Sequence, residues 1–252
     1  MYDGGPRYIP VLEMSLDAVK ELAVRLAAYR PATGPLIVGL TGAVASGKST
    51  LAEQLQAHLQ SNTRAVEVVT TDGFLMTNAR LTELDLLDQK GFPPSYDNAA
   101  FAQALTAIRT QATDFPAYSH VTYDIDPGLT RTLSPPDILI VEGLNLHHRA
   151  IDPQASDPLD MLIYLDADED HLEAWYLARF MDLWAAAEHD PTSFYARFRS
   201  MSAADTQDFA RMVWAKVNLK NLHNNIVLAK PTADLVVLKG PDHSITNIAV
   251  RS

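Results

Sequence analysis

The sequence has no cysteine among its 252 residues. A chain without cysteine has neither a disulfide framework nor a thiol nucleophile, which excludes disulfide-stabilised secreted folds and cysteine-dependent enzymes. A reducing compartment is the simplest setting for such a chain, so we expect a cytoplasmic protein. Hydrophobic residues make up 47% of the sequence, enough for the core of one large α/β domain spanning residues 1–252.

Long hydrophobic runs and an excess of positive charge are also missing. No segment approaches the ~18 apolar residues that a membrane span needs, and the acidic residues near the N-terminus do not fit a signal peptide. The net charge is −11, which argues against a nucleic-acid partner because a phosphate backbone binds to a broad basic surface. We therefore expect neither a membrane nor a nucleic acid as partner, and any bound anion must be held by local cations.

A glycine-rich motif lies between a predicted strand, Leu36 to Leu40, and a helical pattern marked by Leu51 and Leu55. A turn of this kind directs backbone N–H groups toward a polyphosphate at the positive end of the helix dipole. Lys48 is then placed to reach the β- and γ-phosphates, and the Ser49 hydroxyl to bind a bridging Mg²⁺. The motif predicts a nucleotide site made by Gly42, Ala43, Val44, Ala45, Ser46, Gly47, Lys48, Ser49 and Thr50.

Four further apolar runs alternate with helical patterns, which predicts a P-loop α/β fold with a doubly wound, mainly parallel five-stranded sheet and helices on both faces. These strands are expected at 65–71, 137–141, 159–165 and 234–238. Residues 1–34 form an N-terminal extension whose helix is expected to run from Ser15 to about Tyr29. Residues 73–136 are too long for a simple connection, so we expect a lid and substrate-binding insertion with one helix, Asn98 to Arg109. A long helix is expected from about Ala203 to Leu228.

Two carboxylates are predicted at the carboxyl ends of strands, where ligands bind in open parallel sheets. Asp72 follows the second strand and is a candidate to accept a proton from a hydroxyl group, although Asp-Gly is also a common turn pair. Glu142 ends the third strand and is a candidate to hold the water shell of Mg²⁺. Arg179 is a candidate cation for a transferring phosphoryl group, the alternative being a surface salt bridge.

Several longer motifs resemble the type I, bacterial, pantothenate kinases, which lie within the wider group of uridine kinase and phosphoribulokinase. The resemblance extends from about residue 36 to the end of the chain. It is based on residues 70–74, 90–93, 95–97, 118–120, 136–145, 175–176 and 179–180.

The resemblance implies transfer of the γ-phosphoryl group of ATP to the primary hydroxyl of pantothenate, the first step toward coenzyme A, with Mg²⁺ and in a homodimer. It implies that Asp72 is the general base, Lys48 the phosphate lysine, Arg179 the cation on the transferring group and Glu142 the acidic residue near the metal. Residues implied to hydrogen-bond pantothenate are Tyr118, His120, Tyr176 and Asn218. An aromatic wall of Phe194, Tyr195 and Phe198 is implied around its apolar part, and His243 is implied to pack on adenine.

The chain also departs from the family pattern. Glu53 stands where the family has an arginine that helps to bind the inhibitor coenzyme A, so we expect weak feedback inhibition. Asp182 and Leu183 replace lysine and phenylalanine near the acceptor pocket, and the segment before the phosphate loop is markedly shorter, which leaves nucleotide preference open. A kinase of another small hydroxy compound, such as a nucleoside or sugar, and a nucleotide-binding regulator without turnover remain as alternatives.

Overall fold

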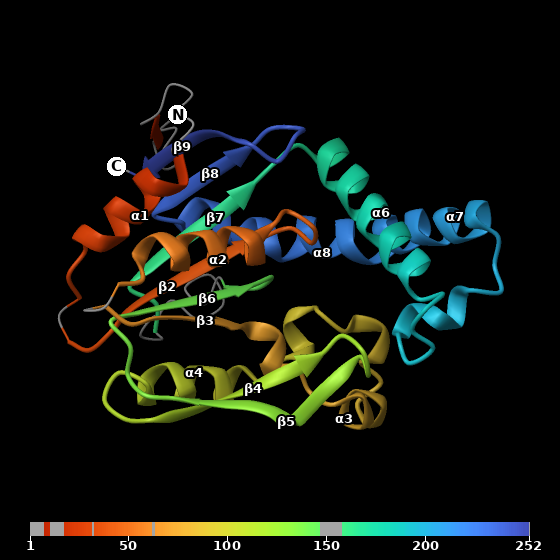
Figure 1. Cartoon of the computed structure of the whole chain (residues 1–252), viewed down its shortest axis with the longest axis horizontal. Coiled ribbons are helices and arrows are strands. Elements are labelled where there is room, and N and C mark those ends of the chain that lie inside the picture. The colour runs from red at the N-terminus through yellow and green to blue at the C-terminus, as the bar shows by residue number, and fades with distance from the viewer. Residues whose placement is uncertain (1–7, 11–17, 32, 62–63, 147–157, 252) are drawn as a thin grey trace, which may run out of the picture.

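The structure is a computed structural model that describes residues 8–10, 18–31, 33–61, 64–146 and 158–251. Within these residues, seven strands form one sheet in the order β1-β9-β8-β7-β2-β6-β3 (Figure 1). Their bounds are β1 Tyr8–Pro10, β2 Leu36–Gly42, β3 Val66–Thr70, β6 Ile138–Gly143, β7 Met161–Asp166, β8 Leu235–Lys239 and β9 Ile245–Arg251.

The five predicted strands are the five parallel strands of this sheet, β8, β7, β2, β6 and β3. The predicted P-loop α/β class is therefore confirmed, although the sheet has two more strands than expected. These are β9, antiparallel to β8, and β1, antiparallel to β9. Only Ile248 is buried in β9, and such a half-polar strand lacks the continuous apolar run that identifies a central parallel strand.

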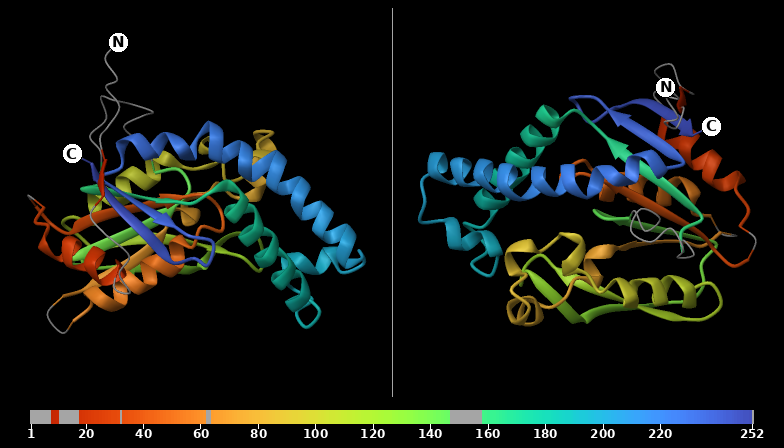
Figure 2. Two further views of the ribbon diagram at one scale, coloured as in Figure 1. Left: turned by 90° about the horizontal axis from the view of Figure 1, so that it is seen from above. Right: turned by 180° about the vertical axis from the view of Figure 1, so that it is seen from behind.

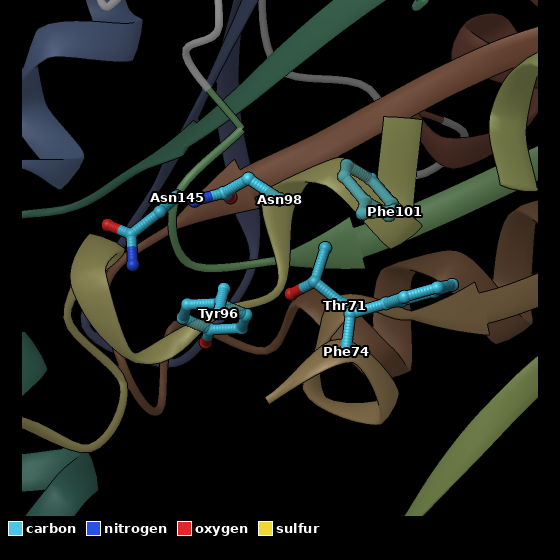
Figure 3. Close-up of a pocket in the computed structure, with 6 residues that line it drawn as sticks. All are labelled: Thr71, Phe74, Tyr96, Asn98, Phe101 and Asn145. Atoms are coloured by element: carbon cyan, nitrogen blue, oxygen red, sulfur yellow. The ribbon is translucent and has the colours of Figure 1, made fainter. Parts of the chain in front are cut away.

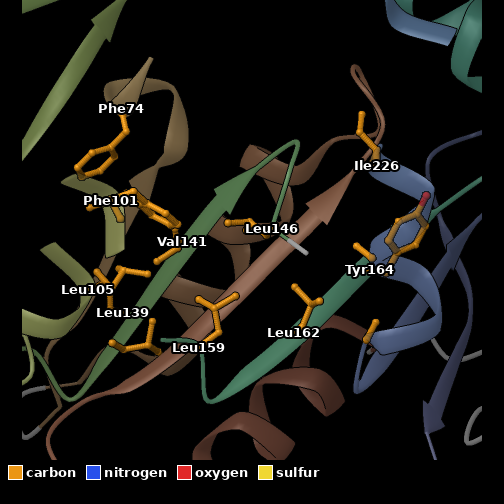
Figure 4. Close-up of a cluster of buried hydrophobic side chains, with 14 of the residues drawn as sticks. Phe74, Phe101, Leu105, Leu139, Val141, Leu146, Leu159, Leu162, Tyr164 and Ile226 are labelled. Atoms are coloured by element: carbon orange, nitrogen blue, oxygen red, sulfur yellow. The ribbon is translucent and has the colours of Figure 1, made fainter. Parts of the chain in front are cut away.

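Both faces of the parallel sheet are covered, because alternate residues of its strands enter two separate cores. One core joins Val38 and Leu40 to helices α1 (Ala18–Ala28) and α2 (Lys48–Leu59). The other joins Leu139 and Val141 to α4 (Asn98–Ala107) and to the segment after α8 (Leu219–Asn224), as Figure 4 shows. Every residue of β2 is buried, which fixes the position of the loop that follows it.

The insertion after β3 contains more regular structure than the one helix predicted there. In addition to α3 (Asn78–Glu83) and α4, it forms an antiparallel hairpin of β4 (Thr113–Ser119) and β5 (Asp124–Leu133). Pro116 interrupts β4 at a register shift, and most of β5 is exposed, so neither strand shows an apolar run in the sequence. The hairpin lies apart from the seven-stranded sheet, beyond β3 and α4 (Figure 1).

The long helix predicted from Ala203 to Leu228 is divided into several segments. These are α7 (Ala203–Val213), a π-helical stretch (Trp214–Asn218), α8, and a 3-10 stretch (Ile226–Thr232). Together with α6 (Glu169–Ala186), α7 extends beyond the carboxyl ends of the parallel strands (Figure 2).

The N-terminal extension is described only in part. The predicted helix is present as α1, whereas its expected first residue, Ser15, lies outside the described residues. Residues 8–10 form a short strand that was not predicted. Among the described helices, none is long and apolar enough to cross a membrane.

Candidate active site

The predicted phosphate loop connects β2 to α2, and all of residues 42–50 lie where the motif placed them. Gly42 approaches β7 so closely that a Cβ there would clash with the carbonyl oxygen of Leu165, and Gly47 has a φ of +85° that favours glycine. The buried Lys48 donates a hydrogen bond of 2.7 Å from Nζ to the carbonyl oxygen of Ala43. The ammonium is therefore turned back across the loop.

Both predicted carboxylates are at the carboxyl edge of the sheet, next to this loop. Glu142 pairs in register with Thr70 of β3 and Leu40 of β2, and Asp72 lies in the 3-10 turn Thr71–Phe74 that follows β3. The Ser49 hydroxyl donates a 3.1 Å hydrogen bond to Oε1 of Glu142. The two residues predicted to hold a metal are thus in direct contact.

Four charged groups of the site act on one another electrostatically. Burial lowers the pKa of Lys48, while the negative charges of Glu142 and Asp72 act to raise it and the positive charge of Arg179 lowers it further. Burial likewise raises the pKa of Glu142, and Lys48 opposes this shift. Arg179, on α6, is exposed and forms no ion pair with any residue that the structure describes, so its charge is available to a ligand.

Tyr96 is a site residue that sequence reasoning missed. Its buried hydroxyl donates a 3.3 Å hydrogen bond to Oδ1 of Asp72, and burial together with the charge of Asp72 raises the pKa of Tyr96 well above its usual range. The phenol therefore remains protonated and holds one oxygen of the carboxylate. Tyr96 lines a small cavity together with Thr71 and Asn145 (Figure 3). The side chains of Thr71 and Asn145 each have a buried oxygen atom without a hydrogen-bond partner among the described residues. The only sequence signal for this contact was the position of Tyr96 in the Ser95–Asp97 motif.

The hairpin contributes Tyr118 and His120, whose ring centroids are 5.3 Å apart. Burial raises the pKa of Tyr118, so this side chain stays a neutral hydrogen-bond donor. Tyr123, which the sequence did not single out, stacks on Phe194 at 3.9 Å and thereby joins the hairpin to the segment before α7. Lys90 also stabilises the hairpin, because its Nζ donates 2.6 Å hydrogen bonds to Asn78 and to the carbonyl oxygen of Tyr123.

The remaining acceptor candidates form one aromatic cluster between α6 and the 3-10 segment Phe194–Phe198. Tyr195 lies edge-on to Phe180 at 5.1 Å, and Phe198 packs against the same ring. Tyr176 hydrogen-bonds with Asn218, and burial raises the pKa of Tyr176. Burial raises the pKa of Tyr195, and the positive charge of Arg179 opposes this shift.

The predicted adenine contact, His243, lies in the turn between β8 and β9, away from the aromatic cluster. Its ring stacks on Trp175 at a centroid distance of 3.9 Å, and its φ is +64°. Burial and the nearby charge of Lys239 lower the pKa of His243. Sequence reasoning missed Lys239, whose Nζ donates a 3.0 Å hydrogen bond to the carbonyl oxygen of Ser46 in the phosphate loop.

The fold and the site define a P-loop kinase, with a phosphate loop, a strand-end carboxylate and an exposed arginine beside an aromatic cluster. The sequence profile of the Phosphoribulokinase / Uridine kinase family matches residues 37–183, more than half of the chain. The protein belongs to this family of kinases, whose members use ATP.

The relatives within this family are more specific. The chain is 42% identical over 228 residues to "Pantothenate kinase" of Rhizobium rhizogenes (strain K84 / ATCC BAA-868). The alignment covers 86% of this chain and 69% of the relative. It is also 42% identical to "Pantothenate kinase" of Agrobacterium fabrum, over 86% of this chain and 71% of that protein. The chain therefore resembles these pantothenate kinases in sequence along most of its own length.

Solved structures share the fold at lower identity. A protein from Silicibacter sp. TM1040 assigned as a fructose transport system kinase superimposes with a TM-score of 0.66 and 25% identity, over 82% of this chain and 92% of that one. D-glycerate 3-kinase from Cryptococcus neoformans superimposes with a TM-score of 0.59 and 15% identity, over 91% of this chain and 95% of that one. The second likeness concerns the fold alone.

Proposed function

We propose that this protein transfers the γ-phosphoryl group of ATP to the primary hydroxyl of pantothenate, the first step of coenzyme A biosynthesis. The observation that carries the proposal is the electrostatic coupling of Lys48 to Asp72 and Arg179, together with the neutral hydroxyl groups of Tyr118 and Tyr176. Pantothenate has a carboxylate, an amide and an apolar part, which hydrogen-bonding and aromatic side chains of this kind complement. The resemblance to pantothenate kinases along most of the chain supports this acceptor.

In the proposed reaction, Asp72 accepts the proton of the acceptor hydroxyl while the oxygen of that hydroxyl attacks the γ-phosphorus. A new P–O bond forms, the bond from the γ-phosphorus to the β–γ bridging oxygen breaks, and ADP leaves with that oxygen. Tyr96 keeps the Asp72 carboxylate oriented through its hydrogen bond, so that the other oxygen is free to face the hydroxyl. Lys48 and Arg179 place positive charge around the transferring group, where negative charge develops.

The contact between Ser49 and Glu142 supports a Mg²⁺ ion at this position. Hydroxyl and carboxylate oxygens are the donors that Mg²⁺ prefers, and it is usually bound by one or two protein oxygens plus phosphates and waters. The described residues contain no group of three or more histidine, aspartate or glutamate side chains that could form a metal cage, which agrees with this mode of binding. When bound, Mg²⁺ neutralises charge on the β- and γ-phosphates.

The acceptor side is proposed to close around pantothenate. The proposal assigns hydrogen bonds to Tyr118, His120, Tyr176 and Asn218, and apolar contact to Phe194, Tyr195 and Phe198. Residues 73–136 act as a lid and substrate-binding insertion of one kinase domain, 1–252. The stacking of Tyr123 on Phe194 supports this role, because it joins the insertion to the wall opposite.

The adenine base is proposed to contact His243, and the phosphates are proposed to bind at residues 42–50.

The resemblance further supports a homodimer and a cytoplasmic location, where ATP is available, together with weak inhibition by coenzyme A. The proposal of weak inhibition by coenzyme A depends on Glu53, which is exposed on α2 five residues beyond Lys48 in the sequence. Light scattering of the purified protein tests the dimer, which a monomeric mass would contradict.

A coupled assay of ADP release over a panel of alcohols tests the function. The panel contains pantothenate, uridine, D-glycerate and fructose, each at matched concentrations with ATP and Mg²⁺. We expect kcat/KM for pantothenate to exceed the others by at least about a hundredfold, because a pocket built to hydrogen-bond one substrate discriminates strongly. Preference for uridine or a sugar would support the alternative kinase, and absence of turnover with every acceptor would support a regulator.

A further inference from the structure

Lys239 is the last residue of β8, and its side chain reaches the phosphate loop. Its Nζ donates a 3.0 Å hydrogen bond to the carbonyl oxygen of Ser46 and lies only 2.7 Å from the place where a Cβ on Gly47 would be. The loop therefore needs glycine at 47 for two reasons, its φ of +85° and the space that this ammonium occupies. A second lysine, besides Lys48, is thus in contact with the loop.

The charge of Lys239 has no counter-ion in the part of the chain that the structure describes. Its partners are the Ser46 carbonyl and the ring of Trp175, whose centroid lies 5.7 Å from Nζ. Lys230 contrasts with it, because that lysine is paired with Asp166 at 2.7 Å. Lys239 is half-buried, and burial lowers its pKa, so an anion placed beside it would stabilise its charged form.

The position of Lys239 links two parts of the site. On one side is the phosphate loop, and on the other is the stack of Trp175 and His243, with ring centroids 3.9 Å apart. The indole N–H of Trp175 donates a 3.1 Å hydrogen bond to the carbonyl oxygen of Pro241, which holds this stack next to the end of β8. A nucleotide with its phosphates in the loop and its base at the stack would pass beside the ammonium.

We propose that Lys239 is a nucleotide-binding residue that contacts an oxygen of the α- or β-phosphate of a nucleoside triphosphate, between the phosphate loop and the Trp175–His243 stack. Lys48 faces the β- and γ-phosphates from within the loop, and Lys239 adds a charge on the side toward the base. The proposal rests on the nucleotide site of the proposed function and is independent of the acceptor. Since these phosphate oxygens carry charge before and after transfer, Lys239 lowers KM for ATP with little effect on kcat.

The test is calorimetric titration of the whole protein and of Lys239→Met with a non-hydrolysable ATP analogue, without any acceptor. We expect the analogue to bind the variant about tenfold more weakly, which is ~1.4 kcal/mol. Inorganic tripolyphosphate should lose a similar factor, whereas adenosine should bind equally to both proteins. In the kinase assay, KM for ATP should rise by about tenfold and kcat should stay within about twofold of the parent value.

Lys216→Met is the matched control, because Lys216 is an exposed lysine whose replacement changes the net charge by the same amount. It should leave analogue binding unchanged. Lys239→Gln is the second variant if Lys239→Met fails to fold, and Lys239→Arg, which keeps the charge, should retain more affinity than either.

Three results would overturn the assignment: unchanged binding of the analogue, an equal loss with adenosine, or an equal loss in the Lys216 control. Failure to phosphorylate pantothenate would refute only the proposed acceptor. In that case, Lys239-dependent binding of the analogue would still support this assignment.

Discussion

The proposed nucleotide side and the proposed acceptor side of this site are built in different ways. The nucleotide side is a contiguous stretch, 42–50, held between a fully buried strand and the helix that follows it. The acceptor side collects side chains from the hairpin, α6, the 3-10 segment 194–198 and the π-helical stretch 214–218. The first is positioned by the backbone of the sheet, the second by side-chain contacts between elements that extend beyond it. The proposed function therefore assigns general kinase chemistry to the first side and acceptor choice to the second.

The largest expected effect is that of Asp72, which stands between the two sides. Asp72→Asn should lower kcat by about 10²–10⁴-fold, because the amide cannot accept the hydroxyl proton. Binding of a non-hydrolysable ATP analogue should stay nearly unchanged, since Asp72 does not contact the loop backbone. Rapid-quench measurement of the transfer step checks this, with Asp88→Asn as control, because Asp88 is an exposed aspartate on a separate turn. Parent-like turnover would remove Asp72 from the mechanism.

The next effect concerns the nucleotide side alone. Lys48→Ala should reduce phosphoryl transfer by about 10²–10³-fold, the usual scale for the loss of one preorganised charge, and by the same factor with every acceptor. The measurement is kcat/KM for pantothenate and for the best alternative alcohol of the panel, with Lys216→Ala as the charge-matched control. A loss of kcat/KM with only one of the two acceptors would contradict the division between a nucleotide side and an acceptor side.

The same division explains what the sequence could and could not predict. The five parallel strands were visible as apolar runs because they are covered on both faces, and the loop was visible as one contiguous motif. Asp72 and Glu142 were predictable because strand ends meet at one edge of a parallel sheet. The hairpin escaped detection because β5 is mostly exposed and both of its strands contain proline.

Side-chain contacts between segments that are distant in the sequence could not be predicted from the sequence. Nothing local to Tyr96 indicates that its hydroxyl meets Asp72, which is 24 positions away in the sequence. Lys239 contacts Ser46 across 193 positions, in a segment with no motif of its own. The acceptor residues were assigned through resemblance to a family, because their spacing in the sequence carries no regular pattern. Residues that act through the tertiary fold therefore need the structure, whereas those positioned by local backbone do not.

A smaller effect is expected on the acceptor side. Asn218→Ala should lower kcat/KM for pantothenate by about tenfold, because it removes one hydrogen-bonding group and takes its partner from the half-buried Tyr176. Binding of ATP should not change. Asn224→Ala is the control, since Asn224 is exposed six positions further along the same helical run. Equal losses with pantothenate and with poor acceptors would mean that Asn218 has a structural role rather than a role in recognition.

The smallest expected effect tests a residue near the nucleotide side that serves neither transfer nor acceptor binding. Glu53 is exposed on α2, where its negative charge repels a phosphorylated inhibitor in solvent-screened surroundings. Glu53→Arg replaces repulsion by attraction, so inhibition by coenzyme A should become a few-fold tighter at low ionic strength and less so at high salt. The measurement is the inhibition constant against ATP, with Gln54→Arg, on the adjacent exposed position, as control. If both arginine variants tighten inhibition equally, the change in net charge explains the effect. If neither variant tightens inhibition, the weak feedback inhibition predicted from Glu53 is wrong. The nucleotide side is then insensitive to charge on this face of the helix.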